Sequence, residues 1–231
     1  MSIKLNVIDG INAARWKNAN MTPWDFGLYG TKVFCGAQGS GKTLSAVRWV
    51  HKLCCLFPSL QLCTNIDLHN MPPWTHIHPY DSLEQLFTLD NGQLGIVYLI
   101  DELQLELNSL ESRNIPISVI TEISQQRKQR KMIVGTAQVL SRLAKPLREQ
   151  FDQIVDCSNW GGVLQINRIY DCDKIKQNEA GEIELADGRL DVFFHRIADY
   201  QRYDTSAKMK KHTKDFIELG RKYDSQLYDK K

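Results

Sequence analysis

The chain has 231 residues, of which 42% are hydrophobic and 24% are charged, and its formal net charge at pH 7 is +2. These values are ordinary for a globular protein and exclude a chain that binds nucleic acid through its overall charge, so such binding would need local basic clusters. The sequence contains no run of about 18 apolar residues and no N-terminal secretion signal, so we expect no membrane span. Its six cysteines show no C-x-x-C spacing, which indicates reduced thiols in a cytoplasmic protein.

Residues 1–29 form a lead-in segment with few structural signals. Two of its aromatic residues, Trp16 and Trp24, could contact an adenine ring or could pack on the domain surface. Both interpretations stay open at this stage.

A phosphate-binding loop follows this segment. It fits the pattern G-x-x-x-x-G-K-[ST] at every fixed position and consists of Gly36, Ala37, Gln38, Gly39, Ser40, Gly41, Lys42 and Thr43. The glycines let successive backbone N–H groups point at the phosphates of a nucleotide, Lys42 adds an ammonium group, and the Thr43 hydroxyl is suited to ligate Mg²⁺. An apolar strand at 31–35 and a helix at 44–57, stopped by Pro58, supply the context that the motif requires. The sequence therefore predicts a site for ATP and Mg²⁺; the alternative is a glycine-rich turn in another α/β protein.

The next region predicts a strand at 60–66 and a short capped helix at 81–87. Between them, His76 and His78 lie on one face of a strand. They could suggest a metal site, but no third ligand is near in sequence, so solvated histidines are the alternative.

A strand that ends in two acids is the second motif. Residues 96–100 are all apolar, which is typical of a central parallel strand buried on both faces. Asp101 and Glu102 follow directly, and at the carboxyl edge of such a sheet they would face the ligand crevice. We expect Asp101 to hold Mg²⁺ through its water shell and Glu102 to orient or deprotonate the attacking water. The acid pair favours hydrolysis; the alternative is a strand that ends in a surface Asp-Glu pair.

Basic residues end the next predicted helix. The pattern predicts a loop at 103–114 and then a helix at 117–131, whose last turns contain Arg127 and Arg130. Cations at a helix C-terminus interact favourably with its dipole, so a solvated end is one interpretation. The other is an arginine that acts on the nucleotide of a neighbouring subunit, or a contact with a phosphate backbone.

A strand at 131–138 carries polar residues at its tip. In P-loop proteins with an additional strand, this strand lies between the two motif strands, so we expect Thr136 and Gln138 near the γ-phosphate, where Gln138 can sense it. A helix at 141–151 carries Arg142, Lys145 and Arg148, and a strand at 153–157 comes next.

The pattern changes after residue 158. Two antiparallel strands are predicted at 163–170 and 190–194, with turns at 180–181 and 187–188. They indicate a small β appendage at the sheet edge, followed by a basic tail and a helix at 213–227. This tail is either solvated or in contact with DNA or a partner.

The predicted fold is α/β: a P-loop NTPase of the additional-strand (ASCE) class, with a central, mainly parallel sheet flanked by helices. We expect an ATPase core at 1–158 and a C-terminal extension at 159–231 that packs on the same domain.

The ordered set of motifs resembles the zonula-occludens-toxin-like ATPases of phages and, more widely, the FtsK/HerA class of DNA-pumping ATPases. The set consists of Gly-Ser-Gly-Lys-Thr at 39–43, Ile-Asp-Glu at 100–102, the basic helix end at 125–131 and the strand that ends in Gln138. The resemblance covers roughly residues 30–205. In the family an arginine often follows the Gln-ended strand, matched here by Arg148, and Tyr203-Asp204-Thr205 is similar to a tail motif of the group. Filamentous-phage members usually continue into a membrane span, whereas this sequence ends at Lys231, so we expect DNA movement rather than membrane extrusion.

The resemblance implies an ATPase that acts as a homo-oligomeric ring and moves or packages DNA during phage or mobile-element morphogenesis, in the host cytoplasm if phage-encoded. ATP would lie between subunits, and a portal, capsid or assembly protein would be a further partner. One subunit would supply Lys42, Thr43, Asp101, Glu102 and Gln138, and the next would supply Arg127, Arg130, Arg142 or Arg148. The alternatives are a filamentous-phage-type assembly or secretion ATPase, a nucleotide-dependent scaffold with little turnover, and an enzyme that transfers phosphate to a nucleoside.

Overall fold

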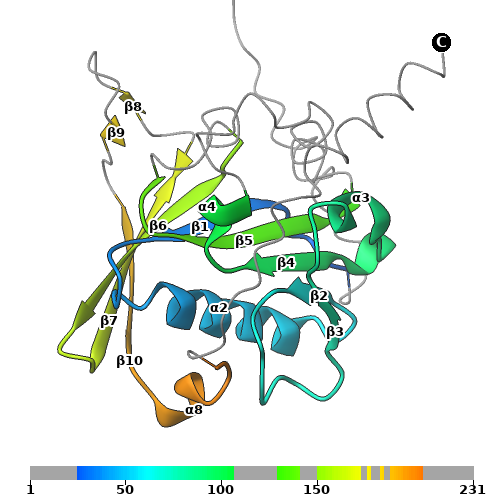
Figure 1. Ribbon diagram of the computed structural model, residues 1–231, viewed down its shortest axis with the longest axis horizontal. Coiled ribbons are helices and arrows are strands. Elements are labelled where there is room, and N and C mark those ends of the chain that lie inside the picture. The colour runs from blue at the N-terminus through cyan, green and yellow to red at the C-terminus, as the bar shows by residue number, and fades with distance from the viewer. Residues whose placement is uncertain are drawn as a thin grey trace, which may run out of the picture.

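A computed structural model describes residues 25–106, 129–140, 150–172, 176–177, 183–184 and 188–204. An eight-stranded sheet with the order β10-β7-β6-β1-β5-β4-β2-β3 forms its centre (Figure 1). Its strands are β1 (Gly30–Cys35), β2 (Gln61–Thr64), β3 (His76–Pro79), β4 (Ile96–Ile100), β5 (Lys131–Ala137), β6 (Gln153–Trp160), β7 (Leu164–Asp171) and β10 (Arg189–Phe194). A separate ladder pairs β8 (Lys176–Gln177) with β9 (Ile183–Glu184). The described helices are α2 (Lys42–Leu56), α3 (Gln85–Thr88), α4 (Leu103–Glu106), α8 (Ile197–Tyr200) and the 3-10 turn η1 (Gly92–Leu94).

The strands from β6 to β3 along this order are all parallel. Strand β5 lies between β1 and β4, which confirms the additional strand of the predicted fold class. Every residue of β1, β4 and β5 is buried, because helices or other segments cover both faces of a parallel sheet. Parallel pairing also brings the carboxyl ends of these three strands to one edge of the sheet.

Two antiparallel strands complete the sheet. Strand β7 pairs antiparallel with β6, and β10 pairs antiparallel with β7. The predicted antiparallel strands therefore lie at the sheet edge, where they continue the central sheet. Strand β6 runs through the boundary that we expected between residues 158 and 159.

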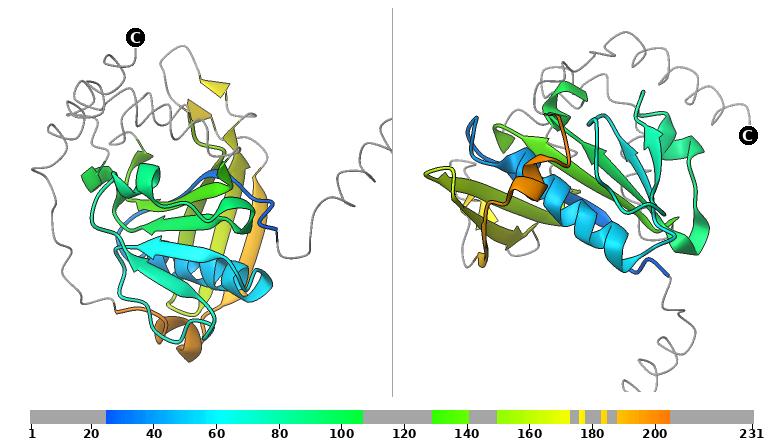
Figure 2. Two further views of the ribbon diagram at one scale, coloured as in Figure 1. Left: turned by 90° about the vertical axis from the view of Figure 1, so that its right-hand side faces the viewer. Right: turned by 90° about the horizontal axis from the view of Figure 1, so that it is seen from below.

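The core has one layer on each side of the sheet. Helix α2 runs along one face, where Leu44, Val47 and Val50 pack against alternate residues of β1, β4 and β5 (Figure 2). Leu86 of α3 and Leu103 of α4 belong to the cluster on the other face.

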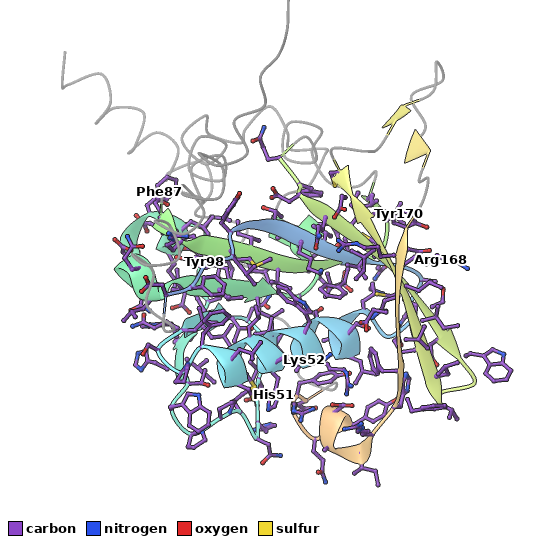
Figure 3. All side chains as sticks on the ribbon, turned by 180° about the vertical axis from the view of Figure 1, so that it is seen from behind. His51, Lys52, Phe87, Tyr98, Arg168 and Tyr170 are labelled. Atoms are coloured by element: carbon purple, nitrogen blue, oxygen red, sulfur yellow. The ribbon has the colours of Figure 1, made fainter. Side chains whose placement is uncertain are left out.

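The hydroxyl of Tyr98, the β4 residue labelled in Figure 3, donates to the Gln85 carbonyl at 2.9 Å and ties α3 to that face.

Two short segments differ from their predictions. The capped helix predicted at 81–87 is limited to α3, which begins at Gln85 and has no side-chain hydrogen bond at its N-cap. Residues 103–106 form α4 instead of the start of a loop, because Leu103 packs into the core directly after the two acids and is 1% exposed. The rest of that predicted loop, most of the helix predicted at 117–131, the helices predicted at 141–151 and 213–227 and most of the predicted turn residues lie outside the described residues. Within the described ranges, no helix has the length and apolar content to cross a bilayer.

Candidate functional site

The phosphate-binding loop connects the end of β1 to the start of α2, and glycine is required at two of its positions. Gly36 has φ 145°, and a Cβ there would lie 2.7 Å from the Cys157 carbonyl oxygen. Gly41 has φ 83°, and a Cβ there would overlap the side chain of Gln165. The loop therefore has a backbone conformation and close contacts that residues with a side chain cannot adopt without strain.

The helix that follows the loop directs positive charge toward it. Lys42 bends back so that Nζ donates to the Ala37 carbonyl at 2.9 Å, and the bond from Ser45 N to Gly41 O, at 2.9 Å, begins the helical ladder. The free N–H groups of the first turn and the helix dipole favour an anion at this position.

The two sequence motifs meet at the carboxyl edge of the sheet. Thr43 Oγ1 donates to Asp101 Oδ1 at 3.1 Å, although 58 residues separate them in the sequence. Asn65, directly after β2, fixes the backbone of the acid: Asp101 N donates to Asn65 Oδ1 at 2.8 Å, and Asn65 Nδ2 donates to the Asp101 carbonyl at 3.1 Å. Sequence reasoning missed Asn65, although its place at the end of a predicted parallel strand could have indicated this edge.

A buried threonine connects the two acids. Thr136 on β5 is 0% exposed, and its Oγ1 donates to Asp101 Oδ1 at 2.5 Å while it accepts from Glu102 N at 2.9 Å. This hydroxyl fixes the acid pair from the strand that lies between the two motif strands.

Glu102 has an unusual backbone conformation. Its φ is 54°, in the left-handed region that costs a residue with a side chain roughly 1–2 kcal/mol. Its carboxylate accepts from Gln138 Nε2 at 3.3 Å and also from Gln104 Nε2. The structure therefore brings together Glu102 and Gln138, which were both predicted for the site, and adds Gln104, which was not.

The donor atoms between loop and acid strand fit a magnesium ion. Mg²⁺ prefers oxygen ligands and is held in nucleotide sites by one or two protein groups together with substrate phosphates. The Thr43 hydroxyl and the Asp101 carboxylate, in contact next to the helix N-terminus, are oxygen donors of this kind.

The arginines predicted to act between subunits lie elsewhere or are not described. Arg130 precedes β5 at the amino edge of the sheet, where its Nε donates to Gln93 Oε1 at 3.3 Å. The seven residues of β5 separate it from Gln138 by about 25 Å, so it cannot reach the site of its own chain. Arg127, Arg142, Lys145 and Arg148 lie outside the described residues, as do Trp16, Trp24, Thr205 and the basic tail.

Strands β6 and β7 supply polar contacts to the loop and to α2 that sequence reasoning missed. Gln165 Nε2 donates to the Ser40 carbonyl at 2.9 Å, Asn159 Nδ2 donates to the Gly39 carbonyl at 3.3 Å from the end of β6, and Ser45 Oγ donates to Asn167 Oδ1 at 3.1 Å. Gln165 and Asn167 alternate in β7 and are both buried, and this polar alternation was the signal available in the sequence.

No protein-family model matches the chain, and no curated protein matches its sequence. Among solved structures, the N-terminal domain of zonular occludens toxin from Neisseria meningitidis has a TM-score of 0.55 and 13% identity, covering 77% of this chain and 100% of that chain. A second solved structure, itself an ATPase domain, has a TM-score of 0.50 and 12% identity, covering 87% of this chain and 98% of that chain. The genome packaging NTPase B204 from Sulfolobus turreted icosahedral virus 2 has a TM-score of 0.47 and 13% identity, covering 72% of this chain and 98% of that chain.

The similarities to the toxin domain and to the ATPase domain confirm the predicted fold. The chain has the α/β fold of P-loop NTPases, and its structural neighbours include the toxin domain that gives its name to the family it resembles in sequence motifs.

Proposed function

We propose that the chain is an ATPase that binds Mg²⁺-ATP at the carboxyl edge of its sheet and uses hydrolysis to move DNA. The observation that carries this proposal is the 3.1 Å contact between Thr43 Oγ1 and Asp101 Oδ1, since it joins the phosphate-binding loop to the acid strand. The fold shared with the second solved structure, the ATPase domain, supports it.

The loop would bind the triphosphate. Its backbone N–H groups would donate to the phosphates, and Lys42 Nζ would exchange its bond with the Ala37 carbonyl for a phosphate oxygen. Thr43 and Asp101 would hold Mg²⁺, which neutralises part of the phosphate charge when bound.

Glu102 would activate the attacking water. The Thr136 hydroxyl holds its backbone N–H, and Gln138 donates to its carboxylate, so the side chain is oriented before substrate binds. A carboxylate held in this way can accept the proton of a water molecule. Gln138 contacts the same carboxylate and would connect the γ-phosphate to the segment after β5.

The working form would be a homo-oligomeric ring in the host cytoplasm, with DNA as its substrate during phage or mobile-element morphogenesis. An arginine from the neighbouring subunit, Arg127, Arg130, Arg142 or Arg148, would stabilise the charge that develops on the γ-phosphate. Arg130 qualifies only in this way, because it lies at the opposite edge of the sheet from its own site.

The test is the ATPase rate of the full chain with and without duplex DNA, together with native mass measurement. Phosphate contacts release counterions, so we expect DNA to stimulate hydrolysis and the stimulation to weaken between about 50 and 200 mM salt. Lys42→Ala is the control and should remove hydrolysis under every condition.

If neither duplex nor single-stranded DNA changes the rate of ATP hydrolysis, the proposal that the chain moves DNA is ruled out. ATP binding without turnover would favour the nucleotide-dependent scaffold, and phosphate transfer to an added nucleoside would favour the transferase.

A further inference from the structure

A pocket of about 300 Å³ extends from the phosphate-binding loop to the C-terminal part of the described chain. Its lining includes Thr43 and Asp101 from the two motifs, together with His195, Tyr200 and Tyr203. The pocket is thus larger than the phosphate and metal positions alone, and its second wall comes from residues that follow β10.

This second wall is fixed to the helix that follows the loop. Arg48 of α2 donates to Asp199 of α8 at 2.7 Å, and the Asp199 side chain is 2% exposed. Arg48 is five residues after Thr43, which is about 8 Å along the helix axis at about 1.5 Å per residue. Helix α8 therefore lies beside the first turns of α2.

The residues after α8 are held by the loop after β2. Tyr203 forms a bridge with Leu68, His69 N donates to the Arg202 carbonyl at 2.7 Å, and Asp204 N donates to the Asp67 carbonyl at 3.2 Å. These backbone bonds join two segments that line the pocket and are far apart in the sequence.

Tyr200 presents an aromatic ring at this wall in a fixed orientation. The residue is 44% exposed, whereas Tyr203 is 8% exposed and packs in the core. His195 Nδ1 lies 2.6 Å from the Tyr200 hydroxyl, and His195 Nε2 lies 3.3 Å from Gln165 Oε1. Since Gln165 also bonds to Ser40, a chain of contacts connects this ring to the phosphate-binding loop.

We propose that Tyr200 stacks on the base of the nucleotide whose triphosphate occupies the loop, and that the segment 195–204 is the nucleoside-binding wall of the site. This inference rests on the proposed function. A base has two apolar π faces that aromatic side chains bind by stacking. Asp67 and Asp204 also line the pocket, and a carboxylate there can accept a hydrogen of the adenine amino group. In this proposal the adenine ring contacts Tyr200, and not Trp16 or Trp24 as one interpretation of the sequence suggested.

The test compares two ligands that share the phosphates and differ in the nucleoside: Mg²⁺-ATP and Mg²⁺-tripolyphosphate, each titrated calorimetrically. Stacking accounts for about 1–3 kcal/mol per base, so Tyr200→Ala should weaken ATP binding by about 5-fold or more and leave tripolyphosphate binding unchanged. Tyr200→Phe keeps the ring and should stay within about 3-fold of the unmodified protein for both ligands. Tyr29→Ala is the control, because Tyr29 is similarly exposed, at 40%, and precedes β1 at the amino edge of the sheet.

If Tyr200→Ala weakens the binding of ATP and of tripolyphosphate equally, the proposal is overturned, because segment 195–204 would then only support the phosphate-binding loop. Unchanged ATP binding would overturn it as well. If the unmodified protein binds neither ATP nor tripolyphosphate, the proposed ATPase function fails together with this inference. That result is distinguishable from the two outcomes above, in which the unmodified protein binds both ligands.

A second measurement does not depend on the folding of a variant. Photolysis of the unmodified protein with 8-azido-ATP should label a peptide within 195–204. Labelling confined to residues 1–24 would assign the base to the tryptophans and overturn the proposal.

Discussion

Gln165 Nε2 donates a hydrogen bond to the carbonyl oxygen of Ser40 at 2.9 Å, across 125 residues of sequence. The same amide also donates to Asn167 Oδ1 at 3.0 Å, and the Gln165 side chain is fully buried. Strand β7 therefore supports the phosphate-binding loop directly, so the C-terminal extension is structurally part of the site.

Replacement of this glutamine should damage the loop and the fold together. Gln165→Leu keeps the volume but removes the donor that Gln165 supplies to the Ser40 carbonyl and to Asn167 Oδ1. We therefore expect a loss of about 1–3 kcal/mol of unfolding free energy and weaker ATP binding. Urea denaturation and calorimetric titration measure the two effects. The control is Gln93→Leu, at an exposed glutamine on the opposite edge of the sheet, which should change neither the stability nor the ATP affinity. If Gln165→Leu leaves the ATP affinity unaltered, the bond between Gln165 and Ser40 is not needed for nucleotide binding.

A methyl group at Gly41 should have two separable effects. It would overlap the Gln165 side chain, and it would be strained by the left-handed backbone at φ 83°. Gly41→Ala should therefore abolish nucleotide binding, whereas the double variant with Gln165→Ala should relieve the overlap and keep the strain. We expect the loss of unfolding free energy in the double variant to be smaller than the sum of the losses in Gly41→Ala and Gln165→Ala, as a double-mutant cycle measures. Losses that add up exactly would contradict this expectation.

Glu102 should matter for turnover and little for binding. Glu102→Gln keeps the shape and the contact with Gln138 but cannot accept a proton, so we expect ATP hydrolysis to fall by about 100-fold or more with ATP affinity retained. Single-turnover kinetics and titration separate the two quantities. Glu84→Gln, next to α3, is the control, and turnover that survives in Glu102→Gln would remove the catalytic assignment.

The hydroxyl of Thr43 should set the magnesium requirement. Thr43→Ala removes the proposed metal donor and its bond to Asp101, so the Mg²⁺ concentration for half-maximal hydrolysis should rise by at least about 10-fold. Thr43→Ser keeps the oxygen and should remain close to the unmodified protein. If alanine and serine behave alike, the hydroxyl does not bind the metal.

Buried thiols should make the fold sensitive to alkaline pH. Burial raises the pKa of Cys54 to about 11 and the pKa values of Cys63 and Cys157 to about 12, from an ordinary value of about 9. Between about pH 9 and these raised pKa values, the unfolded chain releases protons that the folded chain keeps. The unfolding free energy therefore falls as the pH rises above about 9, by up to about 1.4 kcal/mol per pH unit for each thiol. Urea titrations at several pH values measure this slope. Cys63→Ala should reduce it, whereas Cys55→Ala, at an exposed thiol on the same helix as Cys54, should not.

One lysine acts in the opposite direction. Burial lowers the pKa of Lys32 to about 8, so between about 8 and 10.5 the unfolded chain holds a proton that the folded chain has lost, and this contribution rises with pH. Lys32→Met should therefore steepen the alkaline loss of stability. A slope that stays unchanged or becomes shallower would mean that Lys32 keeps its proton in the folded chain.

The order of elements was largely predictable from the sequence, because the relevant signals are local. The glycines of the loop, the apolar run before Asp101 and the break at Pro58 each act on neighbouring residues, and β1, α2, β4 and β5 lie within a residue or two of their predicted ranges. Segment 103–106 was predicted as a loop and forms α4, because Leu103 gains burial in the core that no local pattern shows.

What the sequence by itself determined is the chemistry of the two motifs and the kind of sheet that joins them, since both follow from residue type and spacing along the chain. Only the tertiary structure decided which distant side chains support them: Asn65 and Thr136 hold the acids, Gln165 holds the loop, and Tyr200 lines the pocket. A polar residue in a strand carries no local sign of its partner, because separate elements choose the partners when they pack together and most buried donors and acceptors find one there.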